Sequence, residues 1–183
     1  MSRPPRSAAR SKAGQPRGGA EQGEGGQHFV DPIMLTITKR LEFDAGHRIP
    51  QHKSQCRNLH GHRYALEITL EGEPVDDPES SDHGMLMDFT DVKALAKDHL
   101  VDLWDHAFLV HAGDTLIRGL LDQIPGHKTV VLDRVPTAEN LVAIAFDILD
   151  PLYTERFGNH LKLRRLRLYE TPTSWADCDR KTL

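Results

Sequence analysis

The sequence predicts an α+β domain in which a four-stranded antiparallel sheet has two long helices packed on one face. Three observations support this prediction. Three long stretches alternate apolar and polar residues, which is the period of a β-strand. Two other stretches place apolar residues at helical spacing. The elements follow in the order β-β-α-β-α-β, with a short helix or turn after the first long helix, and this order fits hairpin-connected strands with helices to one side.

The first two strands place three histidines on one face. Residues 33–43 have apolar side chains at odd positions, apart from Lys39, and the same parity continues to His47. Residues 60–71 have them at even positions, which His60 and His62 share. Because successive side chains of a strand point to opposite faces, all three histidines are expected on the apolar face of the sheet.

Capping residues and apolar spacing define the other elements. A first long helix is expected from Thr90, a good N-cap, to Asp105–His106. After it we expect a short helix or turn, a β-branched strand, a second long helix capped by Thr137, and a last strand, over residues 116–123, 129–132, 136–152 and 161–170. The apolar parity of the last strand slips at Arg164–Arg165, which predicts a β-bulge and turns Glu170 inward.

The composition limits the class of protein. A chain of 183 residues with 38% hydrophobic residues fits one globular domain, and its net charge of -4 argues against a general nucleic-acid binder. No apolar run approaches the roughly 18 residues that a membrane span needs. The start of the chain lacks the apolar core of a secretory signal, so the cytoplasm is the expected location. Residues 1–32 are rich in Gly, Arg, Ser, Gln and Pro and are expected to form a disordered tail before a domain at 33–183.

His47, His60 and His62 are candidate metal ligands. A catalytic zinc site takes three protein ligands and keeps a fourth position open, and neutral imidazoles suit zinc best among the common metals. His60 and His62 lie two residues apart on one strand face, so their rings can converge on one ion. His52, in the following loop, competes with His47 as third ligand. The alternative is that these are solvated or core histidines.

Cys56 lies four residues before His60, and only one other cysteine, Cys178, occurs in the chain. Two distant cysteines form no disulfide framework and exclude a zinc site built on two C-x-x-C pairs. A nearby cation would favour the Cys56 thiolate. Three interpretations remain open at this point: a fourth zinc ligand, a nucleophile or base, and an inert buried thiol.

Three polar sites also have ordinary structural explanations. Asp105 can hold the imidazole of His106 in one tautomer if the helix ends between them, but a solvated helix end explains the pair as well. Thr137 and Glu139 read as an N-cap and a first-turn acid. Glu170, turned inward, needs a partner such as a ligand with N–H donors.

Six segments together resemble one enzyme family. They are FDAGHRIP (43–50), CRNLHGHRY (56–64), GMLMDFTDVK (84–93), DHAFL (105–109), PTAEN (136–140) and YET (169–171). In this order they resemble the 6-pyruvoyltetrahydropterin synthase / 6-carboxytetrahydropterin synthase family. The resemblance implies a T-fold (tunnelling fold), whose subunits form homotrimers or homohexamers with active sites between subunits.

The resemblance also implies roles for the candidate residues. His47, His60 and His62 would hold Zn²⁺, Cys56 would be the catalytic thiol, and Asp105 with His106 would move protons. Glu170 would bind the N–H edge of the pterin ring. Thr137 and Glu139 would line the substrate pocket, reaching it from a neighbouring subunit.

The spacing C-x-x-x-H-G-H is similar to that of the 6-carboxytetrahydropterin synthase branch, which acts in queuosine (7-deazaguanine) synthesis. The expected enzyme is a carbon–carbon lyase that converts 7,8-dihydroneopterin triphosphate to 6-carboxytetrahydropterin, acetaldehyde and triphosphate. Arg48, Lys53 and Arg57 are candidate triphosphate contacts. The alternatives are the sister enzyme that makes 6-pyruvoyltetrahydropterin and a non-catalytic zinc- or pterin-binding oligomer.

Overall fold

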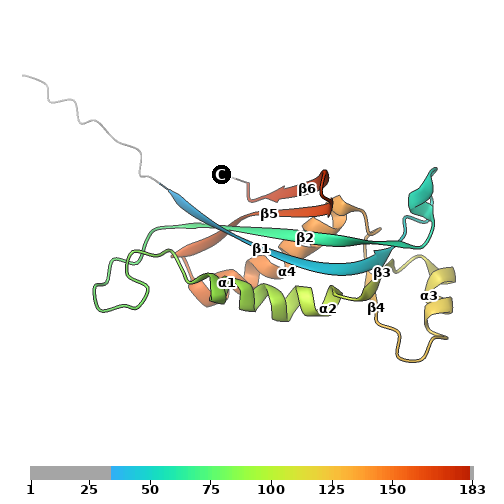
Figure 1. Ribbon diagram of the computed structural model, residues 1–183, viewed down its shortest axis with the longest axis horizontal. Coiled ribbons are helices and arrows are strands. Elements are labelled where there is room, and N and C mark those ends of the chain that lie inside the picture. Colours follow the sequence, from blue (N-terminus) through green and yellow to red (C-terminus); the bar gives the residue numbers. More distant parts are fainter. Residues whose placement is uncertain (1–33, 182–183) are drawn as a thin grey trace, which may run out of the picture. The chain divides into compact units, whose positions relative to one another are not determined.

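A six-stranded mixed sheet forms the centre of the part of the chain that the structure describes, residues 34–181 of a computed structural model (Figure 1). The predicted tail, residues 1–32, lies outside the described residues. The strands follow the spatial order β4-β3-β1-β2-β5-β6. Their bounds are β1 Leu35–His47, β2 His60–Gly72, β3 Ala107–His111, β4 Thr129–Leu132, β5 Leu161–Thr171 and β6 Ser174–Asp179.

The α+β class and all four predicted strands are confirmed, but the prediction of a four-stranded antiparallel sheet is wrong. The pairs β1–β2, β2–β5 and β5–β6 are antiparallel, whereas β3 pairs in parallel with both β1 and β4. The sequence signals for β3 and β6 are weak. Strand β3 has five residues directly after a helix, and the outer strand β6 alternates without a buried side chain.

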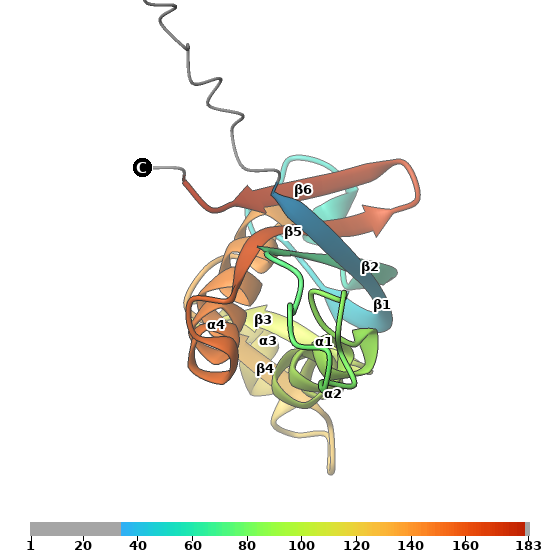
Figure 2. The same ribbon diagram turned by 90° about the vertical axis from the view of Figure 1, so that its left-hand side faces the viewer.

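The helical segments 89–104 and Ala138–Phe157 pack on one side of the sheet, as two perpendicular views show (Figures 1 and 2). The short helix Thr115–Leu121 instead packs on the opposite face of β3, against Val110 and Phe108. Helix α1 continues through a π-helical turn into α2, and the whole segment covers residues 89–104. The bounds are α1 Phe89–Ala96, the π-helical turn Lys97–Val101, α2 Asp102–Trp104, α3 Thr115–Leu121 and α4 Ala138–Phe157. None of these helices, within the described residues, is long and apolar enough to cross a membrane.

The main core lies between the sheet and helices α1, α2 and α4. The inward side chains of β1 and β2, among them Phe43 and Leu66, are buried against α4 residues such as Leu141 and Leu149. Tyr64 stacks on Phe43 with ring centroids 5.3 Å apart. Burial of this apolar surface, at roughly 25 cal/mol per Å², fixes which face of each strand turns inward.

Two local features of the helices and strands bear on the site. Helix α1 is capped by Asp88, whose carboxylate accepts the Thr90 N–H at 2.6 Å, so the predicted N-cap at Thr90 is two residues late. Against β2, Arg165 pairs with Thr69 and Leu163 with Leu70, which leaves Arg164 between them as the extra residue. The predicted bulge is therefore confirmed.

Candidate active site

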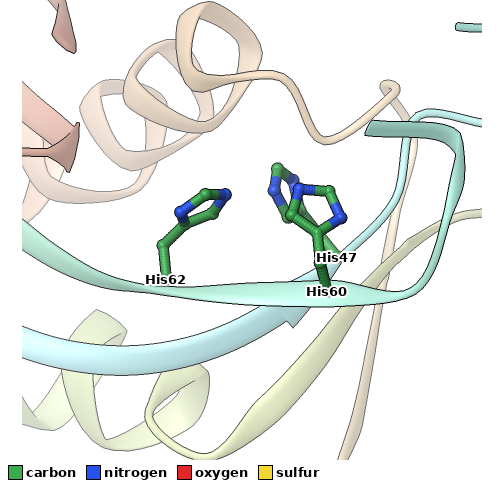
Figure 3. A group of neighbouring side chains, drawn as sticks. All are labelled: His47, His60 and His62. Carbon is green, nitrogen blue, oxygen red and sulfur yellow. The ribbon is translucent and has the colours of Figure 1, made fainter. Parts of the chain in front are cut away.

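Three histidine rings meet where β1 ends and β2 begins (Figure 3). His47 and His60 are direct partners in the antiparallel register, and His62 pairs with Ala45. The ring centroid of His47 lies 4.4 Å from that of His60 and 5.2 Å from that of His62. The centroids of His60 and His62 are 5.0 Å apart. The expected placement on one face is therefore observed, because strand alternation and register bring all three side chains to the same side.

Backbone carbonyls orient two of the rings. His47 Nδ1 donates to the carbonyl oxygen of Pro136 at 2.7 Å, and His60 Nδ1 donates to that of Asn58 at 2.8 Å. A carbonyl oxygen only accepts hydrogen bonds, so the proton of each neutral ring resides on Nδ1. The Nε2 atoms then have free lone pairs, as in metal-binding histidines whose other nitrogen donates to a carbonyl group.

The histidine cluster fits a metal ion. His47 Nε2 and His62 Nε2 are buried without a hydrogen-bond partner, and one ligand atom from each of the three rings lies within 4.8 Å of the others. Unpaired buried polar atoms are costly and call for an explanation, which a shared cation provides. Burial lowers the pKa of His47 and of His62, so both rings are neutral and able to coordinate at neutral pH. A set of three imidazole ligands matches a catalytic zinc site.

Glu170 lies beside this cluster at the end of β5. Its Oε1 atom is 3.5 Å from His47 Nε2 and 4.0 Å from His62 Nε2, and its side chain is 26% exposed. The residues after the bulge alternate so that Glu170 shares the inward face with Leu168. The carboxylate can therefore accept hydrogen bonds from a ligand that reaches the histidines.

Cys56 lies in a short 3₁₀ turn, Gln55–Arg57, within the loop that joins β1 to β2. The Ile49 N–H donates to the Cys56 carbonyl at 2.7 Å and closes this loop. The thiol is half-buried, and after burial and Glu170 it contributes to the raised pKa of Tyr64, whose ring contacts that of His62. Among the described residues, the group of candidate metal ligands at this end of the sheet contains the three histidines without Cys56, which argues against Cys56 as a fourth ligand.

Asp105 and His106 do contact each other, because the helix ends at Trp104. Asp105 Oδ2 is 2.9 Å from His106 Nδ1, while Asp105 Oδ1 accepts the backbone N–H of Asp44 at 3.0 Å. That backbone N–H is the main cause of the lowered pKa of Asp105, and the hydrogen bond from His106 lowers it further. The carboxylate thus holds His106 with its proton on Nδ1 and leaves Nε2 open to solvent.

The structure places this pair on the polar face of the sheet, opposite the histidine cluster. His106 precedes the inward Ala107, is 77% exposed, and lines an open groove of about 470 Å³ together with Gly61, Arg63 and other residues. The groove floor contains the facing glycines Gly46 and Gly61. One chain therefore does not bring His106 and the histidine cluster to the same face of the sheet.

The remaining candidates take different positions. Thr137 caps α4, because its hydroxyl accepts the Asn140 N–H at 3.3 Å. It directly follows Pro136, whose carbonyl accepts the hydrogen bond from His47 of the same chain. Glu139 is exposed. His52 is not part of the cluster, and its Nδ1 accepts the Ser54 N–H instead, so the alternative with His52 as third ligand is wrong.

Of the candidate triphosphate contacts, Arg48 is already engaged. Its Nε and Nη2 atoms donate to the two oxygens of the Asp114 carboxylate at 2.6 and 2.9 Å, while Lys53 and Arg57 are exposed. Asp114 is nearly fully buried and also caps α3. Asp114, Asp44 and Lys128 support the site but were not predicted from the sequence. Of these three, only Asp114 had a recognisable sequence signal, its position directly before helix α3.

Comparison with known proteins identifies the family. The family model described as 6-pyruvoyl tetrahydropterin synthase matches residues 36–181. The chain belongs to this family. Membership confirms the predicted resemblance and the predicted class, a pterin-processing enzyme with a small-molecule pterin substrate.

Curated relatives span nearly the same length as the matched region. A protein from Rickettsia bellii named 6-carboxy-5,6,7,8-tetrahydropterin synthase is 37% identical over 145 residues, which cover 79% of this chain and 99% of the relative. One with the same name from Haemophilus influenzae is 31% identical over 147 residues, which cover 79% and 98%.

Solved structures show the same fold. An uncharacterized protein from Wolinella succinogenes superposes with a TM-score of 0.67 at 21% identity, over 82% of this chain and all of that one. The 6-pyruvoyl tetrahydropterin synthase of Caenorhabditis elegans superposes with a TM-score of 0.53 at 24% identity, over 81% and 97%. The family and these neighbours support the predicted T-fold, with the sheet extended to six strands here.

Proposed function

We propose that this chain is a zinc-dependent 6-carboxy-5,6,7,8-tetrahydropterin synthase of queuosine (7-deazaguanine) biosynthesis. It would convert 7,8-dihydroneopterin triphosphate and water to 6-carboxytetrahydropterin, acetaldehyde and triphosphate. The observation that carries the proposal is the buried histidine cluster with two unpaired Nε2 atoms beside Glu170, at the two strand ends that the Cys56 loop joins. The names of the curated relatives support the carboxy product.

His47, His60 and His62 are the residues that would hold the zinc ion. A bound zinc ion supplies Lewis-acid chemistry, which lowers the pKa of hydroxyl groups on the substrate side chain. The carbonyls of Pro136 and Asn58 keep two of the rings in the ligating tautomer. The buried floor of the cluster excludes water from its inner side, which strengthens electrostatic interactions there.

Cys56 and Glu170 act on the substrate from the histidine face. In this proposal the Cys56 thiolate abstracts a proton from the substrate side chain. Glu170 accepts hydrogen bonds from the N–H edge of the pterin ring, each worth about 1–3 kcal/mol when it is buried and charged. Thr137 and Glu139 complete the substrate pocket near Pro136.

Asp105 and His106 would serve a site on a second copy of the chain. Asp105 holds His106 in one tautomer, and the solvent-facing Nε2 atom is free to move protons. Because this pair lies across the sheet from the histidine cluster, we propose a homotrimer or homohexamer with active sites between subunits. The cytoplasm remains the predicted location.

Product analysis tests the function directly. The zinc-loaded protein is incubated with 7,8-dihydroneopterin triphosphate, and the pterin product and acetaldehyde are identified by mass spectrometry. Formation of 6-carboxytetrahydropterin with acetaldehyde supports the proposal. A 6-pyruvoyl product without acetaldehyde would identify the sister enzyme, and pterin binding without turnover would identify a non-catalytic protein.

Two variants separate the role of the thiol from that of the ligands. Cys56→Ala is expected to keep zinc and fold but to lose turnover, and loss of zinc would instead make Cys56 a structural ligand. His60→Ala is expected to lose zinc, as measured by elemental analysis. Unchanged zinc content in His60→Ala would rule out the three-histidine site.

A further inference from the structure

His106 adopts a backbone conformation that its side chain disfavours. Its φ is +58°, in the left-handed region where a Cβ atom crowds the following carbonyl. Such residues persist when the surrounding structure holds them, and they concentrate at functional sites. The groups that hold His106 in this turn therefore decide where its imidazole points.

The peptide bond between Asp105 and His106 is held from both sides. The His106 N–H donates to the Asp44 carbonyl oxygen at 2.6 Å, and the Asp105 carbonyl oxygen accepts from Lys128 Nζ, also at 2.6 Å. Fixing both ends of one peptide unit fixes its plane, and the φ of His106 is the next torsion along the chain. Asp44 and Lys128 thus act on the same peptide unit from opposite directions.

Lys128 is itself anchored. Its own carbonyl oxygen accepts the Phe108 N–H at 2.9 Å, which joins the approach to β4 with β3 just past the turn. Its ammonium group also donates to the Asp102 carbonyl oxygen at 2.7 Å, so it binds two carbonyls at the C-terminal end of α2. A cation there is favoured by the helix dipole as well as by the two hydrogen bonds.

We infer that Lys128 is a positioning residue for the Asp105–His106 pair, because it clamps the strained turn that aims the His106 imidazole into the groove. The inference rests on the proposed function for its catalytic consequence only. Without the clamp the turn relaxes, the contact between Asp105 and His106 Nδ1 loosens, and the imidazole samples both tautomers. The reaction then loses its oriented proton carrier while the substrate pocket around Glu170 is untouched.

If Lys128 acted on the Asp105–His106 pair only through its positive charge, removing another lysine nearby would have the same effect. Lys97 pairs with the Asp102 side chain at the same helix end, and its ammonium group interacts through space with Asp105. Lys97 therefore offers a matched control, since Lys97→Met removes the same charge from the same region and leaves the clamped carbonyls bound. Asp44 and Arg63, which face His106 in the groove, stay unchanged in both variants.

The test compares Lys128→Met, Lys128→Arg and Lys97→Met in the full-length, zinc-loaded protein. The ¹⁵N chemical shifts of the His106 ring, assigned by their absence in His106→Gln, report its tautomer. In the wild type and in Lys97→Met we expect one tautomer, with the proton on Nδ1. In Lys128→Met we expect averaged shifts, a fall in kcat of about tenfold or more and an unchanged KM. Lys128→Arg is expected to restore both.

Several outcomes overturn the inference. Wild-type ring shifts in Lys128→Met would do so even if kcat fell, and so would a matching change in Lys97→Met. If Lys128→Met does not fold, ring shifts in Lys128→Gln decide in its place, with a single Nδ1-protonated tautomer contradicting the clamp. If the wild-type protein shows no synthase activity, the proposed function fails, but the tautomer measurement still decides the role of Lys128.

Discussion

His106 has the one positive φ found for a residue other than glycine between positions 34 and 181. Three other positive φ angles in this part of the chain belong to Gly84, Gly126 and Gly158, where the conformation has no steric cost. At His106 the imidazole is retained in spite of that cost. The imidazole at this position is therefore present at a cost in conformational stability.

We expect His106→Gly to be more stable than His106→Ala by about 1 kcal/mol, because glycine tolerates the left-handed turn whereas alanine keeps the Cβ strain. Both variants should lose synthase activity, since neither has an imidazole. Urea unfolding of the two variants under identical conditions measures the difference in unfolding free energy. Equal stabilities would show that the turn is not strained.

The Thr137 hydroxyl is the N-cap of α4, so its removal is expected to lower the free energy of unfolding whatever its role in the reaction. Thr137→Ala is expected to lower the free energy of unfolding by about 1 kcal/mol, because the Asn140 N–H loses its acceptor. Thr137→Ser retains the hydroxyl and is the matched control. Thermal unfolding of both variants checks this, and a Thr137→Ser as unstable as Thr137→Ala would contradict the capping role.

At the scale of elements, the sequence predicted the strands whose alternation is enforced by burial. Leu41, Phe43 and Ala45 alternate with exposed or half-buried neighbours because one face of β1 packs on the core. Strand β6 has no buried residue, so its pattern contains no such signal. The parallel pairing of β3 could not be inferred locally, because it depends on where α1 and α2 return the chain to the edge of β1.

The loop between β3 and α3 is tied to the end of β1 by one ion pair. Asp114 is 6% exposed and receives two hydrogen bonds from Arg48, the residue that follows the candidate ligand His47. Those hydrogen bonds lower the pKa of the Asp114 carboxyl. The pair therefore links the position of His47 to the β3–α3 connection.

We expect Asp114→Asn to lower the free energy of unfolding of the zinc-free protein by about 2 kcal/mol at pH 7, because charged hydrogen bonds are lost. A carboxylate with a lowered folded pKa contributes stability above its unfolded pKa and loses it as the pH falls through the folded pKa. The gap between wild type and variant should thus close in strong acid. Urea unfolding at pH 7 and near pH 2.5 measures this, with the exposed Asp122→Asn as control. A gap independent of pH would contradict it.

At the scale of the whole molecule, the proposed metal links the two longest neighbouring strands. The buried Nε2 atoms of His47 and His62 lack partners, so a cation that pairs them stabilises the folded state alone. We expect excess zinc to raise the melting temperature of the chelator-treated protein in scanning calorimetry. His60→Ala should lose most of that increase, and an equal increase in both proteins would place the zinc elsewhere.

The candidate site was predictable residue by residue, but its division between two faces was not. Strand parity placed His47, His60, His62 and Glu170 correctly, because it depends only on local alternation. The position of His106 depends on strand β3, which was not predicted from the sequence, and on a left-handed turn that no sequence pattern predicts. Sequence reasoning therefore found the parts of the site without finding that one chain separates them.

This separation yields a test of the proposed shared site. Cys56→Ala and His106→Ala are each expected to be inactive. If a site takes Cys56 from one copy and His106 from another, random co-assembly of equal amounts leaves about a quarter of the sites intact, since closed oligomers repeat one interface between copies. Co-expressed variants should then recover about that share of wild-type activity.

A second mixture makes the result specific. In the proposed site Cys56 and His60 come from the same chain, so co-assembly of Cys56→Ala with His60→Ala leaves no site with both groups and should recover nothing. Activity in the first mixture but not in the second would place His106 in a neighbour's site. Inactivity of both mixtures, in oligomers shown by mass spectrometry to contain both variants, would mean that His106 acts within its own chain after a rearrangement of the β1–β3 edge.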